Sequence, residues 1–147
     1  MSDGAKSVSV PTITAAAARD LVTRAAERAN EIGVPMCIAI SDYAGDLKAF
    51  LRMDGAAQAS ISIAQDKAHT STNGFGMSTD AWWDFIKDDP PLLHGIVKEP
   101  RLIVFGGGFP IKENGQIIGG IGVSGGHYTQ DSDVARSGVE RAGLVAG

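Results

Sequence analysis

The feature that most constrains this 147-residue chain is an apolar strand interrupted by glycines, which directly follows a tight turn. Ile111-Lys112-Glu113, Asn114-Gly115 and Gln116-Ile117-Ile118 have the pattern of two strands joined by a type I′ turn. The second strand continues through Gly119-Gly120-Ile121-Gly122-Val123. Because glycines leave part of a sheet without side chains, this segment predicts either a helix packed closely on the sheet or room for a flat ligand.

Helical spacing and capping signals predict the remaining elements. Helices are expected between Thr14 and Gly33, over 57–72, over 80–87, and from about Gln130 to Val145 with Thr129 as its cap; strands are expected over 34–41, 47–52 and 101–105. The run Asp88-Asp89-Pro90-Pro91 ends the third helix, because proline cannot continue a helix. Residues 92–97 are too short and ambiguous to assign.

The resulting element order is α-β-β-α-α-β-β-β-α. Both groups of strands are joined by tight turns, and no βαβ crossover repeats. This order predicts an α+β fold in which a five-stranded antiparallel sheet is flanked by helices. The length fits one domain, so we expect a flexible tail over 1–11 and a single domain over 12–147.

Charge and composition exclude several classes of protein. The chain has 13 basic and 17 acidic residues and a pI near 5.2, so its surface repels phosphate backbones and anionic lipid. No apolar run approaches the roughly 18 residues of a membrane span, and residues 1–14 lack a signal-peptide layout. We therefore expect a cytoplasmic protein that binds neither nucleic acid nor membrane. The single cysteine, Cys37, lies in an apolar strand, which favours a buried inert thiol over a nucleophile.

The junction between the last strand and the last helix is the first candidate site. It reads Ser124-Gly125-Gly126-His127-Tyr128. Such a junction exposes backbone N–H groups at the positive helix end, where a carboxylate or phosphate can bind. His127 and Tyr128 could add a proton donor or an iron ligand. In the alternative, the two glycines only form a tight turn and His127 lies in solvent.

The second candidate is the segment from Trp82 to Ile96. It contains Trp82, Trp83, Phe85 and His94, which could form a wall or lid around an aromatic ligand. Ordinary packing or a subunit interface is the commoner use of such a cluster.

Three further residues are less specific candidates: Lys67, His69 and Arg101. We expect Lys67 on a solvated helix face. The histidines at 69, 94 and 127 are 25 and 33 residues apart, which is not a metal-ligand spacing, so no metal site is predicted.

Short motifs spread over roughly residues 12–145 occur in a specific order. They are Gly33–Pro35, Ser41–Leu47, Arg52–Ala56, Asp66–Thr70, Gly106–Ile111 and Ile118–Gly125, followed by Gln130-Asp131. Together they resemble the GlcG/HbpS-like proteins, a family named for heme binding or degradation that includes the C-terminal domain of one class of corrinoid adenosyltransferase. The resemblance implies a profilin-like α/β/α fold, a homo-oligomer and a pocket for a small aromatic or tetrapyrrole ligand.

On this resemblance we expect a small flat-ligand binding protein, with heme as the best-known ligand. The first helix has no histidine, so no iron ligand carries over from it. The alternative is a cofactor-independent lyase of aromatic degradation, because similar cytosolic proteins convert 4-hydroxylaminobenzoate to protocatechuate and ammonia. There His127 or Tyr128 would donate a proton, and helix N–H groups or Arg101 would hold the carboxylate. An oligomeric accessory protein without chemistry of its own is the third reading.

Overall fold

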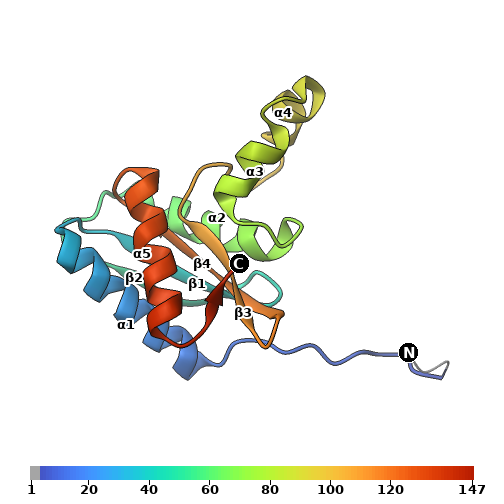
Figure 1. The fold of residues 1–147 in the computed structure, drawn as a ribbon, viewed down its shortest axis with the longest axis horizontal. Coiled ribbons are helices and arrows are strands. Elements are labelled where there is room, and N and C mark those ends of the chain that lie inside the picture. The colour runs from blue at the N-terminus through green and yellow to red at the C-terminus, as the bar shows by residue number, and fades with distance from the viewer. Residues whose placement is uncertain (1–3) are drawn as a thin grey trace.

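The computed structural model describes residues 4–147 of the chain. In chain order its elements are α1 (Ala15–Ile32), β1 (Cys37–Asp42), β2 (Leu47–Arg52), α2 (Ser60–Asn73), α3 (Thr79–Ile86), α4 (Pro90–Ile96), β3 (Gly108–Glu113), β4 (Gln116–Ser124), α5 (Tyr128–Arg141) and β5 (Val145–Ala146). Of the tail expected over 1–11, residues 1–3 lie outside the described residues. Residues 4–12 form neither helix nor strand and lead away from the body (Figure 1).

A five-stranded antiparallel sheet forms the middle of the molecule, in the order β2-β1-β4-β3-β5. Helices α1 and α5 pack together on one face, and α2 covers the other (Figure 1). The larger core lies on the α1 and α5 side and includes the fully buried Leu21, Ile38, Ile121 and Val134. The predicted α+β class and the five-stranded antiparallel sheet are confirmed.

Local signals account for the best-predicted elements. The Thr14 hydroxyl accepts a hydrogen bond from the Ala17 N–H at 3.1 Å and starts α1, and Gly33 ends this helix in the left-handed region at φ 74°. Asn114 and Gly115 both have positive φ, at 53° and 77°. That is the backbone of a type I′ turn, so the predicted β3–β4 hairpin is confirmed.

The glycines of β4 allow α2 to pack directly on the sheet. A Cβ atom on Gly120 would lie 2.6 Å from the Ala68 carbonyl oxygen, and one on Gly122 would collide with the Ala64 carbonyl oxygen. Helix packing is therefore the use that the structure makes of these glycines, rather than a ligand-sized gap on the sheet.

The prediction of a strand over 101–105 is wrong, because these residues form no strand in the structure. Arg101 has a left-handed φ of 65°, and the backbone beside it bonds to the Thr70 side chain instead of a strand. The fifth strand is β5, in which Ala146 pairs with Ile111 of β3. A strand of only two residues carries no alternating pattern, so no sequence signal predicts it.

The boundaries of the last helix also differ from the prediction. The helix runs from Tyr128 to Arg141, and His127 is its cap in place of Thr129. It ends before Val145 because the chain turns at Gly143, whose φ is 80°. This turn brings β5 back beside β3.

Helices α3 and α4 project from the body as an arm (Figure 1). The unassigned residues 92–97 lie mostly in α4, whose first turn holds Pro90 and Pro91 and whose cap is Asp89. The Asp89 carboxylate accepts the Leu92 N–H at 3.4 Å. Within residues 4–147, no helix has both the length and the apolar character needed to cross a bilayer.

Candidate functional site

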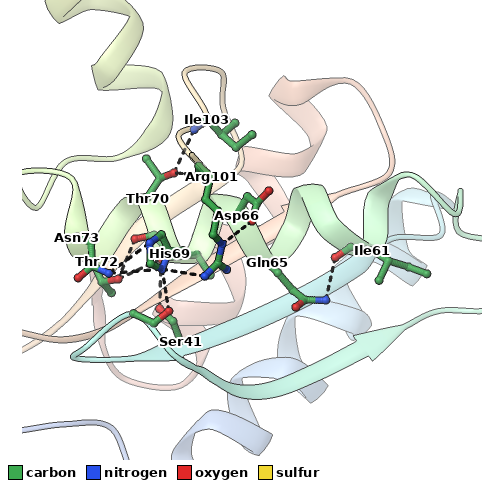
Figure 2. Close-up of polar contacts among 12 residues, drawn as sticks. Ser41, Ile61, Gln65, Asp66, His69, Thr70, Thr72, Asn73, Arg101 and Ile103 are labelled. Atoms are coloured by element: carbon green, nitrogen blue, oxygen red, sulfur yellow. Dashed lines mark hydrogen bonds and ion pairs between the residues drawn. The ribbon is translucent and has the colours of Figure 1, made fainter. Parts of the chain in front are cut away.

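A stripe of polar side chains along α2 is the centre of the candidate site (Figure 2). Asp66 and Asn73 each lie three or four residues from both His69 and Thr70, which places the four side chains along one side of the helix. This face meets two segments far away in the sequence, the β1–β2 turn and residues 101–103.

The β1–β2 turn fixes the His69 ring. The His69 Nδ1 atom lies 3.0 Å from the Gly45 carbonyl oxygen, and the Asn73 side chain donates to the Ala44 carbonyl at 3.1 Å. Gly45 has a φ of 88°, and a Cβ atom there would collide with the Asn73 amide. In the tautomer that donates from Nδ1 to Gly45, His69 Nε2 is left as an acceptor.

Arg101 reaches the same cluster from the opposite side. Its Nε donates to the Asp66 carboxylate at 2.8 Å, and its Nη1 lies 3.2 Å from His69 Nδ1. The Thr70 hydroxyl donates to the Arg101 carbonyl at 2.8 Å and accepts the Ile103 N–H at 3.1 Å. These bonds hold Arg101 in its left-handed conformation, which is a strained one for a residue with a side chain.

A pocket of about 190 Å³ opens beside this cluster, between α2, α3 and the end of α4. We name it the His69 pocket; its main lining residues are His69, Phe75, Trp82, Ile96, Arg101 and Leu102. The Trp82 ring is stacked on Phe75 at 5.4 Å and only 2% exposed. Among residues 4–147, no atom accepts a hydrogen bond from its buried indole N–H. The His69 pocket therefore combines apolar walls with polar groups from α2 and Arg101.

A second pocket, of about 410 Å³, lies along α3. We name it the Tyr128 pocket; it is lined mainly by Asp80, Trp83, Asp84, Phe105 and Tyr128. Trp83, Phe105 and Tyr128 are 46%, 43% and 49% exposed. Adjacent residues on a helix point about 100° apart, so the predicted tryptophans are separated: Trp82 lines the His69 pocket, and Trp83 lines the Tyr128 pocket.

Three backbone N–H groups around the start of α5 are already paired with side chains of the protein. The Gly126 N–H donates to the Asp131 carboxylate at 2.9 Å, the His127 N–H to the Gln130 side chain at 3.0 Å, and the Thr129 N–H to His127 Nδ1 at 3.3 Å. Side chains of the protein itself therefore occupy three of the N–H groups that were expected to bind an anion at this junction.

The other predicted site residues fall in different surroundings. His127 is exposed, and its ring lies 4.1 Å from the Tyr128 ring. Ser124 is buried at the end of β4, and Gly125 and Gly126 form the half-buried turn after it. Phe85 is 52% exposed and packs edge-on to Trp82, and His94 is exposed on α4. The structure thus brings His69 and Arg101 together in one pocket, and Trp83 and Tyr128 together in another.

The expectation that Lys67 lies on a solvated face was wrong, because its side chain is completely buried. Its Nζ donates to the Asp131 carboxylate at 3.0 Å and to the Val123 carbonyl at 2.8 Å. It also lies 5.1 Å from the centre of the Phe105 ring. Burial lowers the pKa of Lys67 and raises the pKa of Asp131, because removal from water disfavours each charged form.

One sequence signal could have revealed the buried pair of Lys67 and Asp131. Lys67 and Asp131 lie in two of the motifs that carry the family resemblance, and they have opposite charges. The prediction for Cys37 held: the thiol is buried and free, and burial raises its pKa.

Comparisons with known proteins agree on one family. A family model described as "Haem degrading protein HbpS-like" matches residues 13–140. The chain is 34% identical over 140 residues to a 15.0 kDa protein of the dhaT-dhaS intergenic region of Citrobacter freundii, covering 92% of this chain and 95% of that protein. It is 33% identical to the corrinoid adenosyltransferase PduO of Salmonella typhimurium, covering 80% of this chain but only 35% of PduO. Protein GlcG of Escherichia coli is 32% identical over 71% of this chain and 75% of GlcG.

Solved structures indicate the same family. Klebsiella pneumoniae protein ORFY superposes with a TM-score of 0.89 at 32% identity, over 97% of this chain and 98% of ORFY. A complex of PduOC with heme superposes with a TM-score of 0.81 at 29% identity, over 92% of this chain and 97% of PduOC. By its match to the family model and its relatives over most of its length, the chain belongs to the HbpS-like family.

Proposed function

We propose that this protein binds heme and that the Tyr128 pocket receives it. The observation that carries the proposal is the gathering of three half-exposed aromatic rings, those of Trp83, Phe105 and Tyr128, around one pocket. Exposed aromatic faces of this kind are typical of sites for flat ligands. Membership in a family named for heme, and a heme complex of the similar PduOC, support the same ligand class.

The chemistry of the residues around the Tyr128 pocket suits a heme. The volume of this pocket, about 410 Å³, is more than twice that of the His69 pocket, at about 190 Å³. Tyr128 offers a phenol oxygen, which is an established type of heme-iron ligand, and the adjacent His127 offers an imidazole. A bound heme would supply the redox chemistry of its iron, while Trp83 and Phe105 would hold the ring by stacking.

The charges around this pocket constrain how such a ligand enters. Asp80 and Asp84 line the pocket together with the aromatic rings. Their carboxylates repel the two propionates of a heme. We therefore expect the apolar edge of the ring to face α3 and the propionates to stay in solvent.

Titration with hemin, followed by the Soret band, tests the proposal. We expect saturation at one heme per chain, and we expect Tyr128→Phe to weaken binding about tenfold and to change the ligand-dependent bands, because the iron loses its phenol ligand. Tyr43→Phe is the matched control, since Tyr43 is similarly exposed, at 44%, and lies on the β1–β2 turn. Absence of a Soret shift, or equal effects of the two substitutions, would refute the proposal.

The lyase remains a second prediction, tested by ammonia release from 4-hydroxylaminobenzoate. Arg101 and Tyr128, which were expected to hold the carboxylate and donate the proton, line different pockets. A lyase would therefore need His69 in place of Tyr128 as the partner of Arg101. The homo-oligomer also stays a prediction, which sedimentation equilibrium tests.

A further inference from the structure

We infer that the Tyr128 pocket binds an organic cation whose charge is surrounded by apolar groups, such as a quaternary ammonium compound. The inference rests on the residues that line this pocket, which include aromatic rings and carboxylates from separate segments of the chain. It does not depend on heme, because it concerns the charge that the pocket selects rather than the ligand named in the proposed function.

Helix α3 supplies both carboxylates and one of the rings. Trp82 and Ile86 lie four residues apart and form the buried side of this helix, at 2% and 0% exposure. Asp80 lies three residues before Trp83 and four before Asp84, and all three line the pocket. The helix therefore presents an aromatic ring and two carboxylates to the same space.

The other two rings come from the segment around Phe105 and from the start of α5. The buried Lys67 Nζ lies 5.1 Å from the centre of the Phe105 ring and packs against it. A Cβ atom on Gly106 would lie 2.5 Å from Ser132 Oγ and 3.1 Å from the Tyr128 carbonyl oxygen, so these two segments are packed closely. The rings of Phe105 and Tyr128 nevertheless stay 43% and 49% exposed, which leaves them accessible to a ligand.

The composition of this lining favours a cation. The faces of aromatic rings carry partial negative charge and attract ammonium groups, and cages of such rings bind quaternary ammonium ligands. The two carboxylates add full negative charges; Asp80 accepts a hydrogen bond from the neutral Ser78 hydroxyl at 2.6 Å, which does not cancel its charge. No lining residue in the described part of the chain is a lysine or an arginine. The charges that repel heme propionates therefore attract a ligand of the opposite sign.

Two lysines near the pocket do not reverse this charge. Lys87 Nζ lies 3.3 Å from the Asp84 carboxylate, but these side chains are 44% and 74% exposed, and exposed ion pairs of this kind are weak. Lys67 forms a buried ion pair with Asp131, so that pair carries no net charge. Both lysines thus leave the pocket with a negative potential.

Three probes of similar shape and different charge test the inference. Choline carries a trimethylammonium group, 3,3-dimethylbutan-1-ol replaces it with a neutral tert-butyl group, and 3,3-dimethylbutanoate has the tert-butyl group and a negative charge. Each is titrated with the full-length protein at low ionic strength, because salt screens exposed carboxylates. Proton NMR of the ligand methyl groups reports binding, since aromatic faces shift these resonances upfield. We expect choline to bind about tenfold more tightly than the alcohol, and the carboxylate to bind most weakly.

Substitutions in the pocket identify the groups responsible. Replacement of both carboxylates, Asp80→Asn with Asp84→Asn, should weaken choline binding about fivefold without weakening the alcohol, and Trp83→Leu should reduce the upfield shift. Asp54→Asn and Tyr43→Leu are the matched controls, because both residues are exposed and lie outside the pocket. Equal binding of choline and the alcohol, preference for the carboxylate, or unchanged choline binding by the double variant would overturn the inference.

Two measurements separate the possible failures. Circular dichroism shows whether the variants are folded, and if they are not, the comparison of the three probes on the unsubstituted protein decides. Hemin is titrated separately. A protein that binds choline but no hemin would refute the proposed function and support this inference, whereas one that binds hemin but no choline would overturn this inference alone.

Discussion

Replacement of Lys67 by Met tests the energetics of the buried pair that links α2 to α5. Met keeps most of the length of the side chain but removes the ammonium, which leaves the Asp131 carboxylate, 3% exposed, with the Gly126 N–H as its remaining partner. Breaking a buried ion pair by removal of one partner costs about 3–5 kcal/mol. For a chain of this size that corresponds to a fall in Tm of roughly 10 °C.

A second substitution and the pH identify the cause of that loss. Asp131→Asn in the Lys67→Met background removes the stranded charge but keeps an oxygen for the Gly126 N–H, so we expect it to restore about 2 kcal/mol. Without the ammonium, the folded-state pKa of Asp131, already raised by burial, lies further above its unfolded value. The stability of Lys67→Met is therefore lost as the pH rises through that folded pKa, and its deficit relative to the unsubstituted protein shrinks as the pH falls toward 4.

Urea unfolding at a fixed protein concentration, followed by circular dichroism at pH 7 and pH 4, measures these differences. A single substitution that costs less than about 1 kcal/mol at pH 7 contradicts the reasoning, because a desolvated unpaired carboxylate cannot cost so little. A double variant no more stable than Lys67→Met would show that lost packing, rather than stranded charge, causes the effect.

Three further substitutions test other parts of the fold. Gly122→Ala places a methyl group against the Ala64 carbonyl, and we expect it to lower the free energy of unfolding by about 1–3 kcal/mol in urea titration. Gly115→Ala puts a side chain at φ 77° and should cost about 1 kcal/mol, measured in the same way. Hydrogen bonds from Arg141 and Arg28 lower the pKa of Glu31 to about 2 from 4.5, so its contribution to stability is lost as the pH falls from 4.5 toward 2. Glu31→Gln should remove that part of the acid unfolding curve, and high salt should reduce the difference.

The elements that the sequence predicted best depend on neighbouring residues. The start of α1 needs only the hydroxyl of Thr14 opposite a nearby N–H, and the β3–β4 hairpin needs only Asn114 and Gly115 in the left-handed region. Such preferences are visible in a short window of sequence. The α+β class follows from the order of these elements, so it was also predictable.

The candidate site was only partly predictable, because its residues come together through the tertiary fold. His69 and Arg101 were named as candidates, but their contact joins positions 32 residues apart. The apolar run from Arg101 to Phe105 has the composition of a strand, and Thr70 bonds to its backbone in place of a neighbouring strand. The recurrence of Asp66, His69, Thr70 and Asn73 on one helix face was present in the sequence, but nothing local distinguishes a binding stripe from a solvated one.

The burial of Lys67 shows why the glycines and the ion pair form one feature. A lysine on a helix is normally assigned to solvent, because its ammonium is costly to desolvate. Here a Cβ atom on Gly107 would lie 2.6 Å from Lys67 Nζ, and one on Gly122 would lie 2.9 Å from Lys67 Cβ. Gly122, which lets α2 approach the sheet, therefore also makes room for the start of the Lys67 side chain, and Gly107 makes room for its ammonium. Asp131, 64 residues away, supplies the opposite charge. The glycines and the buried lysine therefore depend on each other, because the glycines without Lys67 would leave a void, and Lys67 would not fit without the glycines.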